Sequence, residues 1–164
     1  MLRGITVGCG SFGHIHLEGW QRVDDARIVA VVDKDEGVAL AAANRFGAAA
    51  YTQVVHAVEE MAPDFVDVIT RPESHLEVVD AVAARGCHVL CQKPIASTWD
   101  ESVEVVETCR RHGVKLMICE NWRWQPWYRA IKKLVDEDTI GEVTTISLIR
   151  RDSRALAKPP FPNE

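Results

Sequence analysis

The sequence predicts an α/β protein with a doubly wound parallel sheet, followed by the start of a truncated α+β second domain. Short apolar runs alternate along the chain with longer segments of helical periodicity. The apolar runs are continuous, as in parallel strands that are buried on both faces. Right-handed crossovers between such strands give the order 3-2-1-4-5-6, with helices on both faces of the sheet.

Capping residues mark where several helices should begin and end. Asp35 fits the N-cap of a helix over 36–46, and Gly47 fits its C′ position. Two S/T-x-x-E patterns, which begin at Ser74 and Thr98, match the capping box that opens a helix. We expect strands at 5–7, 28–32, 49–51, 65–69, 87–91 and 114–119, and helices after the first strand and at 36–46, 53–61, 74–85 and 98–112.

The turn after the first strand carries the pattern G-x-G-x-x-G. Gly8 permits the tight turn, Gly10 lets the backbone approach a pyrophosphate, and Gly13 lets the helix pack closely on the strand. The following helix N-terminus offers free N–H groups and a positive dipole end. Asp33 ends the second strand about 20 residues later, where a ribose hydroxyl would lie. The pattern therefore predicts dinucleotide binding; the alternative is a glycine turn that only packs a helix on a sheet.

The character of the chain changes at Glu120. The segment ENWRWQPWYR is rich in tryptophan, and Pro126 suits the first turn of a helix to about Val135. Residues 142–151 alternate apolar and polar side chains, which is typical of a strand with one wet face. One helix and one strand cannot form a domain alone. We therefore interpret 1–120 as a dinucleotide-binding Rossmann domain, 121–164 as the crossover helix and first strand of an incomplete substrate domain, and the chain as a fragment.

Composition excludes several classes of protein. The formal charge is −5 without a basic cluster, which argues against nucleic-acid binding. No apolar run could cross a bilayer, and a strand begins almost at residue 1, which leaves no room for a signal peptide. The five cysteines are odd in number and form no C-x-x-C pair, so we expect reduced thiols in a cytoplasmic protein. The histidines show no metal-ligand spacing, and no metal is predicted; His14 and His16 face different ways on a helix.

Residues at the carboxyl ends of the strands are the candidates for chemistry, because ligands of doubly wound sheets bind there. They are Asp33, Thr70, Lys93 and Asn121. Lys93 lies between a strand and a proline, and a lysine near a cationic nicotinamide could exchange a proton with a substrate hydroxyl. The alternative is a solvated loop lysine.

Two further groups of residues have competing interpretations. His75 could contact a nicotinamide ribose or assist proton transfer, or it could be a satisfied histidine at a helix start. Trp122, Trp124 and Trp127 could stack on a sugar face or form a hydrophobic plug between domains.

Four segments together resemble the Gfo/Idh/MocA oxidoreductases, over nearly the whole chain up to about Ser153. They are VGCGSFGHIH, which has His16 three residues after the last glycine; DVITRPESH at 67–75; HVLCQKPIA at 88–96; and ENWRWQPWYRAIKKLVDEDTIGEV. The third segment departs from the family's glutamate-lysine-proline motif, because Gln92 stands in the place of the glutamate.

The resemblance implies an NAD(P)-dependent dehydrogenase that transfers hydride between a nicotinamide and a hydroxyl-bearing carbon of a sugar, inositol or polyol. Lys93 would be its active-site lysine. An aspartate and a histidine that share proton transfer in the family have no counterpart in this chain. The family also associates through its second-domain sheet, which implies a homo-oligomer. The cofactor-binding residues would be Gly8, Gly10, Ser11, Phe12, Gly13, Asp33, Lys34, Thr70, Arg71, Pro72, His75, Gln92 and Asn121.

Asp33 favours NAD over NADP, since a carboxylate pairs with a ribose diol and repels a 2′-phosphate, although Lys34 could soften that repulsion. Two other functions remain open. One is a nicotinamide-binding regulator or sensor without catalysis, because this fold can bind a dinucleotide without reacting it. The other is a Rossmann oxidoreductase that acts on an amino acid or a linear acid.

Overall fold

The structure is a computed structural model that describes residues 1–149. Contacts within the chain divide it into two units, Met1–Glu120 and Asn121–Glu164. The interpretation of the second unit as the beginning of a substrate domain stays a prediction.

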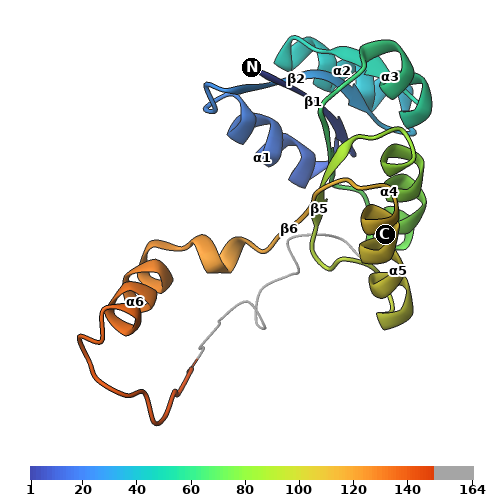
Figure 1. The fold of residues 1–164 in the computed structure, drawn as a ribbon. Coiled ribbons are helices and arrows are strands. Elements are labelled where there is room, and N and C mark those ends of the chain that lie inside the picture. The colour runs from blue at the N-terminus through green and yellow to red at the C-terminus, as the bar shows by residue number, and fades with distance from the viewer. Residues whose placement is uncertain (150–164) are drawn as a thin grey trace, which may run out of the picture. The chain divides into compact units, whose positions relative to one another are not determined.

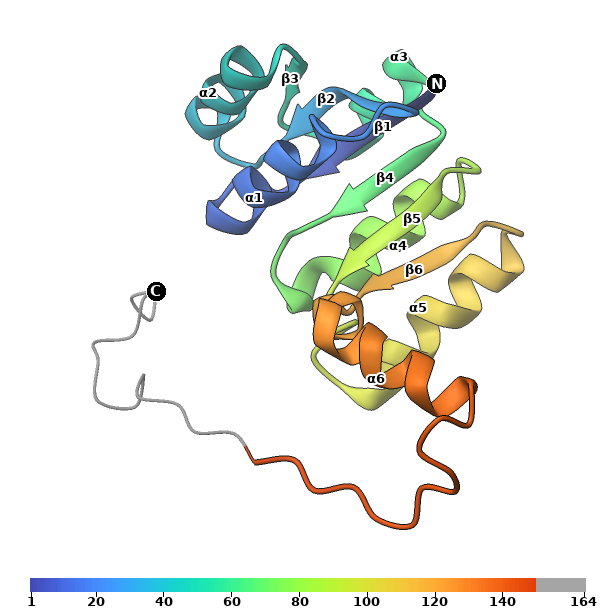
Figure 2. The ribbon, with the colours of Figure 1, turned by 90° about the vertical axis from the view of Figure 1, so that its left-hand side faces the viewer.

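The first unit is built on one six-stranded sheet (Figures 1 and 2). The strand order is β3-β2-β1-β4-β5-β6, and every neighbouring pair is parallel, which confirms the predicted topology. Each strand lies within a few residues of its predicted place. The bounds are β1 Leu2–Val7, β2 Ala26–Val32, β3 Ala49–Tyr51, β4 Phe65–Val68, β5 His88–Gln92 and β6 Leu116–Cys119.

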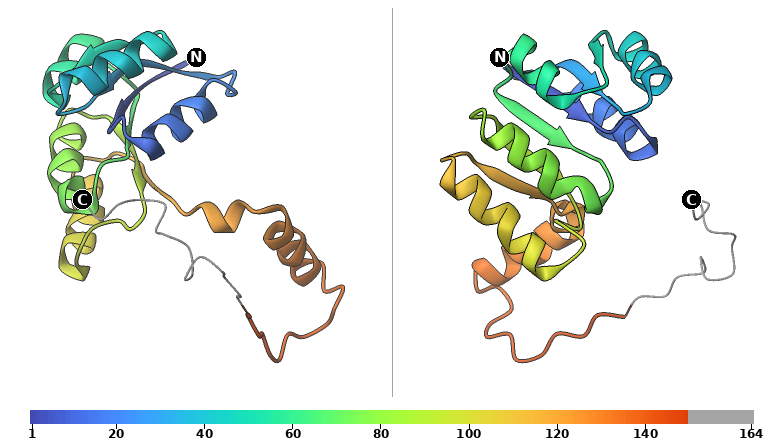
Figure 3. Two further views of the ribbon diagram at one scale, coloured as in Figure 1. Left: turned by 180° about the vertical axis from the view of Figure 1, so that it is seen from behind. Right: turned by 90° about the vertical axis from the view of Figure 1, so that its right-hand side faces the viewer.

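Helices cover both faces of this sheet (Figure 3). Buried residues of α3, α4 and α5 pack against Ile5, Val7 and Val68 on one face. On the other face, Leu17 of α1 and Ala42 of α2 pack against Val31. The bounds are α1 Ser11–Trp20, α2 Glu36–Phe46, α3 Val54–Met61, the 3₁₀ turn η1 Pro72–Ser74, α4 His75–Ala83 and α5 Trp99–Arg111.

Three of the predicted caps are confirmed. Asp35 Oδ1 accepts the Val38 N–H at 3.1 Å at the start of α2, and Gly47 ends that helix with φ +70°. Thr98 and Glu101 form a complete capping box at the start of α5. These helix ends are therefore determined by residues adjacent in the sequence.

The capping box predicted at Ser74 is wrong. Ser74 is the last residue of the 3₁₀ turn η1 and already has helical backbone angles (φ −104°, ψ −1°), and its side chain makes no cap bond to α4. Its hydroxyl instead donates to Thr70 Oγ1 at 2.8 Å and is also placed to donate to the Arg71 carbonyl at 3.0 Å. The α-helix begins at His75 and ends at Ala83, two residues before the predicted end.

The second unit contains the 3₁₀ turn η2 Asn121–Trp124 and helix α6 Pro126–Asp136. Pro126 occupies the first turn of α6, as predicted. The strand predicted over 142–151 does not form in its described part, 142–149. A strand requires a partner for its backbone hydrogen bonds, and the described residues of this unit provide none. Residues 150–151 lie outside the described residues.

Within residues 1–149, no helix combines the length and apolar character that a bilayer span requires.

Helix α5 begins with a side-chain cap bond and α3 begins without one. This difference predicts different effects of alanine substitution on stability. Thr98→Ala removes the side-chain acceptor at the α5 N-terminus and should lower the free energy of unfolding by about 1 kcal/mol. Gln53→Ala is the matched control, because Gln53 is the N-cap of α3 but makes no side-chain cap bond. Urea unfolding measures both; equal losses of stability would contradict the capping account of α5.

Candidate dinucleotide site at the carboxyl edge of the sheet

The carboxyl ends of β1 and β4 lie side by side at the switch point of the sheet. After β1 the chain turns into α1 on one face, and after β4 it turns into η1 and α4 on the other. The Ile69 N–H donates to the Val7 carbonyl at 2.8 Å, so the two loops start in contact. In a doubly wound sheet, the crevice between two such loops is where ligands bind.

Two positions of the loop after β1 require glycine because of contacts within the protein. Gly8 has φ +98°, and a Cβ there would lie 2.7 Å from the Ile69 carbonyl oxygen. A Cβ on Gly13 would overlap the Gly8 carbonyl oxygen. These contacts agree with a tight turn at Gly8 and close helix packing at Gly13.

Gly10 differs from both. Its φ is −71°, and a Cβ there would meet no protein atom within 4 Å. Neither backbone strain nor packing within the described chain therefore demands glycine at this position. The open space beside the Gly10 backbone leaves room for close approach of a ligand, which is the role that the pattern predicts.

The N-terminus of α1 opens onto the same loop. Gly10 is the N-cap without a side-chain bond, and the first turn contains no acidic residue. Ser11 and Phe12 are exposed there. The backbone N–H groups and the positive end of the helix dipole are thus directed at a space where phosphates could lie.

Asp33 joins β2 to the glycine loop. Its Oδ2 accepts the Cys9 N–H at 2.8 Å, and its Oδ1 accepts the Asp35 N–H at 3.0 Å. Each oxygen keeps further lone-pair capacity for a ligand hydroxyl. Burial, and secondarily the Asp33 charge, raises the pKa of the Cys9 thiol to about 12, so this thiol stays protonated near neutral pH. Lys34 is exposed beside the carboxylate.

The loop after β4 contains Thr70, Arg71 and Pro72. Thr70 and Pro72 are half-buried, and Arg71 is exposed. This loop borders the glycine turn through the close contact between Gly8 and the Ile69 carbonyl. The three residues therefore lie at the carboxyl edge of the sheet, next to the glycine turn.

His75 is fully buried, which favours its structural interpretation over contact with a ligand. Its Nε2 lies 3.0 Å from the Thr70 carbonyl oxygen. Its Nδ1 lies 3.2 Å from the Ile95 carbonyl oxygen and 3.3 Å from Cys91 Sγ. The ring thus links the loop after β4 to the loop after β5.

Lys93 follows β5 at the same edge and is exposed. Its N–H donates to Gln92 Oε1 at 2.7 Å, and the Lys93–Pro94 peptide bond is cis. Gln92 Nε2 lies 3.1 Å from His16 Nε2 on α1. The residue that departs from the family motif is therefore hydrogen-bonded both to α1 and to the lysine backbone.

Asn121, by contrast, belongs to the second unit and is exposed in η2. Its part in the cofactor site stays a prediction. Trp122, Trp124 and Trp127 are each about half exposed in that unit. Their two interpretations both stay open.

Sequence reasoning missed a polar cluster around Asp67, a fully buried residue of β4. Asp67 Oδ2 accepts from Trp20 Nε1 at 2.7 Å and lies 3.0 Å from His16 Nδ1. Cys119 is also near: ligand atoms of His16, Asp67 and Cys119 lie within 4.8 Å of one another. A metal-ligand spacing could not reveal this group, because its members come from three distant elements. The direct bond between His16 and Asp67 accounts for their proximity without a metal.

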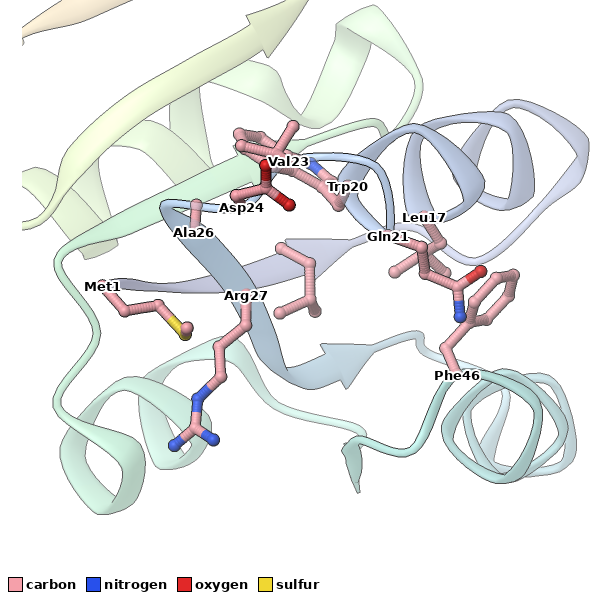
Figure 4. Close-up of a pocket in the computed structure, with 10 residues that line it drawn as sticks. Met1, Leu17, Trp20, Gln21, Val23, Asp24, Ala26, Arg27 and Phe46 are labelled. Carbon is pink, nitrogen blue, oxygen red and sulfur yellow. The ribbon is translucent and has the colours of Figure 1, made fainter.

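A hollow of about 330 Å³ lies away from the carboxyl edge, between the end of α1 and the start of β2 (Figure 4). Met1, Trp20, Asp24 and Arg27 are among its lining residues. None of the predicted cofactor-binding residues lines it, so it is not the candidate site.

Comparison with known proteins shows the family. Residues 2–120 match the family model GFO_IDH_MocA, described as an oxidoreductase family with an NAD-binding Rossmann fold. The chain belongs to this family, and the resemblance noted from the sequence is confirmed.

Individual relatives agree with this assignment. The D-apiose dehydrogenase of Paraburkholderia graminis is 37% identical over 140 residues, which are 85% of this chain and 37% of that protein. The inositol 2-dehydrogenase of Rhizobium meliloti is 32% identical over 154 residues, 91% of this chain and 45% of that protein. The structure of an Agrobacterium radiobacter oxidoreductase, solved with NAD⁺, L-tartaric acid and magnesium, matches with a TM-score of 0.82 at 32% identity. The match covers 86% of this chain and 42% of that protein's chain. The chain thus spans less than half the length of these relatives.

The glycine geometry predicts different results for two alanine substitutions. Gly13→Ala forces the α1 backbone away from Gly8 and should cost about 1–3 kcal/mol of folding stability. Gly10→Ala should change stability by less than about 0.5 kcal/mol. It should nevertheless weaken NAD binding about tenfold, roughly 1.4 kcal/mol, because its methyl group fills the space left for the ligand.

Urea unfolding and NAD titration of both variants test this assignment. Unchanged NAD affinity in Gly10→Ala would contradict the role given to the open space.

Proposed function

We propose that this chain is the cofactor-binding part of an NAD-dependent oxidoreductase that acts on a hydroxyl-bearing carbon of a sugar, inositol or related polyol. The observation that carries the proposal is the open backbone at Gly10, which shares the carboxyl edge of one parallel sheet with the exposed Lys93. Membership of an NAD-binding oxidoreductase family supports it. A bound nicotinamide supplies the hydride acceptor or donor.

The predicted cofactor-binding residues would hold different parts of the dinucleotide. Gly8, Gly10, Gly13, Ser11 and Phe12 would hold the pyrophosphate at the α1 N-terminus. Asp33, with Lys34 beside it, would hold the adenosine ribose. Thr70, Arg71 and Pro72 would line the nicotinamide side, with Gln92 and Asn121 as further contacts. His75 is not proposed as a ligand contact, because its ring is buried against backbone carbonyls.

Lys93 would act on the substrate. Its ammonium group is exposed and can donate a hydrogen bond to the substrate oxygen. During oxidation that oxygen loses its proton as the carbon loses hydride, and a lysine held at this position can exchange the proton. A neighbouring positive nicotinamide would favour the neutral amine that accepts it.

The substrate class rests on relatives that are named D-apiose dehydrogenase and inositol 2-dehydrogenase. This chain covers less than half of the length of each. We further propose a cytoplasmic location, from the five free cysteines, and self-association through the second-domain sheet.

A nicotinamide-binding sensor without catalysis is the alternative function. It is favoured by Gln92, which removes the charge that the family motif places beside the lysine. Lys93 argues against it, because a sensor has no need of a basic group there. An oxidoreductase of amino acids or linear acids is a third alternative.

Substitution of Lys93 separates the enzyme from the sensor. In the longest gene product that contains this chain, Lys93→Ala should lower kcat by about 10²–10⁴-fold and leave NAD affinity nearly unchanged. Lys115→Ala is the matched control, since Lys115 is also exposed but precedes β6 at the opposite edge. Absence of turnover in every form, with NAD binding retained, would favour the sensor.

Asp33 predicts the choice of cofactor. The chain should bind NAD more tightly than NADP, because the carboxylate repels a 2′-phosphate. Asp33→Asn should shift the ratio of the two affinities toward NADP by about tenfold or more, because the like-charge repulsion disappears. Fluorescence titration with both cofactors measures the ratio; tighter NADP binding by the unmodified chain would contradict the assignment.

A further inference from the structure

A chain of hydrogen bonds runs from the buried carboxylate of Asp67 to the backbone of Lys93. Asp67 Oδ2 faces His16 Nδ1 at 3.0 Å, and His16 Nε2 faces Gln92 Nε2 at 3.1 Å. Gln92 Oε1 then accepts the Lys93 N–H at 2.7 Å. Four residues from β4, α1 and the end of β5 are thus connected in one line.

The two ends of this line determine where its protons lie. The Lys93 N–H can only donate, so Gln92 directs its oxygen at Lys93 and its NH₂ group at His16. His16 Nε2 must then accept, and a neutral ring carries its proton on Nδ1. That proton is donated to Asp67, whose Oδ2 also accepts from the Trp20 indole. Each of the three hydrogen bonds in the line therefore joins one donor to one acceptor.

We propose that Asp67, His16 and Gln92 form a positioning relay that holds the backbone of Lys93 at the carboxyl edge of β5. Asp67 selects the ring tautomer of His16, the ring orients the Gln92 amide, and the amide oxygen holds the Lys93 N–H. The catalytic meaning of the relay rests on the proposed function, but its hydrogen bonds are a property of the free chain. None of the three residues needs to touch the substrate.

The relay gives a reason for glutamine at position 92. A glutamate carboxylate could still accept the Lys93 N–H, but it has no proton to donate to His16 Nε2. The ring would then need protons on both nitrogens, between two carboxylates. A neutral histidine and a glutamine therefore form a matched pair beside Asp67.

Nuclear magnetic resonance of the ¹⁵N-labelled chain at pH 7, without cofactor, tests the relay. His16 should show one neutral tautomer with its proton on Nδ1. In Asp67→Leu this preference should be lost, the Trp20 indole resonance should move, and the Lys93 amide should exchange about three- to tenfold faster, as expected for one lost hydrogen bond.

Two variants at position 92 cut the relay at its last step and remain informative if Asp67→Leu does not fold. Gln92→Met should speed Lys93 amide exchange by a similar factor while His16 keeps its Nδ1 proton. Gln92→Glu should give a doubly protonated His16 ring and leave Lys93 protected. Ser102→Ala, which removes a hydroxyl bonded to the Thr98 carbonyl in α5, is the control and should change neither signal.

Either of two results would overturn the relay. One is a wild-type His16 ring with its proton on Nε2. The other is an Asp67→Leu chain in which the His16 spectrum changes but Lys93 exchange does not. The magnetic resonance experiment contains no cofactor or substrate. Failure of NAD binding or of turnover would therefore reject the proposed function and leave the relay result unaffected.

Discussion

The arrangement of residues at the carboxyl edge of the sheet depends on the close packing of α1 on the end of β1. Gly13 lies against the Gly8 carbonyl at a distance that excludes even a methyl group. This contact brings the α1 N-terminus to the loop where a phosphate could lie. The same packing places His16 and Trp20 over β4, where both reach Asp67. One backbone contact thus supports both the candidate cofactor site and the polar line to Lys93.

Local patterns predicted most of the fold, because a parallel sheet with right-handed crossovers leaves few topologies. Asp35 and Thr98 cap their helices as expected, since each bond joins residues three apart. Ser74 does not cap α4, because it is the last residue of the 3₁₀ turn η1 and already has helical backbone angles. The predicted strand over 142–151 does not form within 142–149 for a different reason. Alternation of apolar and polar side chains shows which face of a strand would meet water, but it gives no information about a partner strand.

Part of the candidate site could likewise be predicted from the sequence, and part could not. Gly8, Gly10, Gly13 and Asp33 belong to the first βαβ unit, so their spacing carries information about their arrangement. The contacts of His16 join residues 51 and 76 positions apart, to Asp67 and Gln92 respectively, and no periodicity reports them. One sign was present: Asp67 interrupts the apolar run FVDVI, and a carboxylate inside a buried strand requires partners.

The buried ring of His75 has a mechanical consequence. It bonds the Thr70 carbonyl on one loop and faces the Ile95 carbonyl on the next, so displacement of one loop disturbs the contacts of the other. A molecule that presses on the loop after β4 therefore meets the combined stiffness of both loops. A buried side chain can in this way keep the loop after β4 and the loop after β5 at a constant separation.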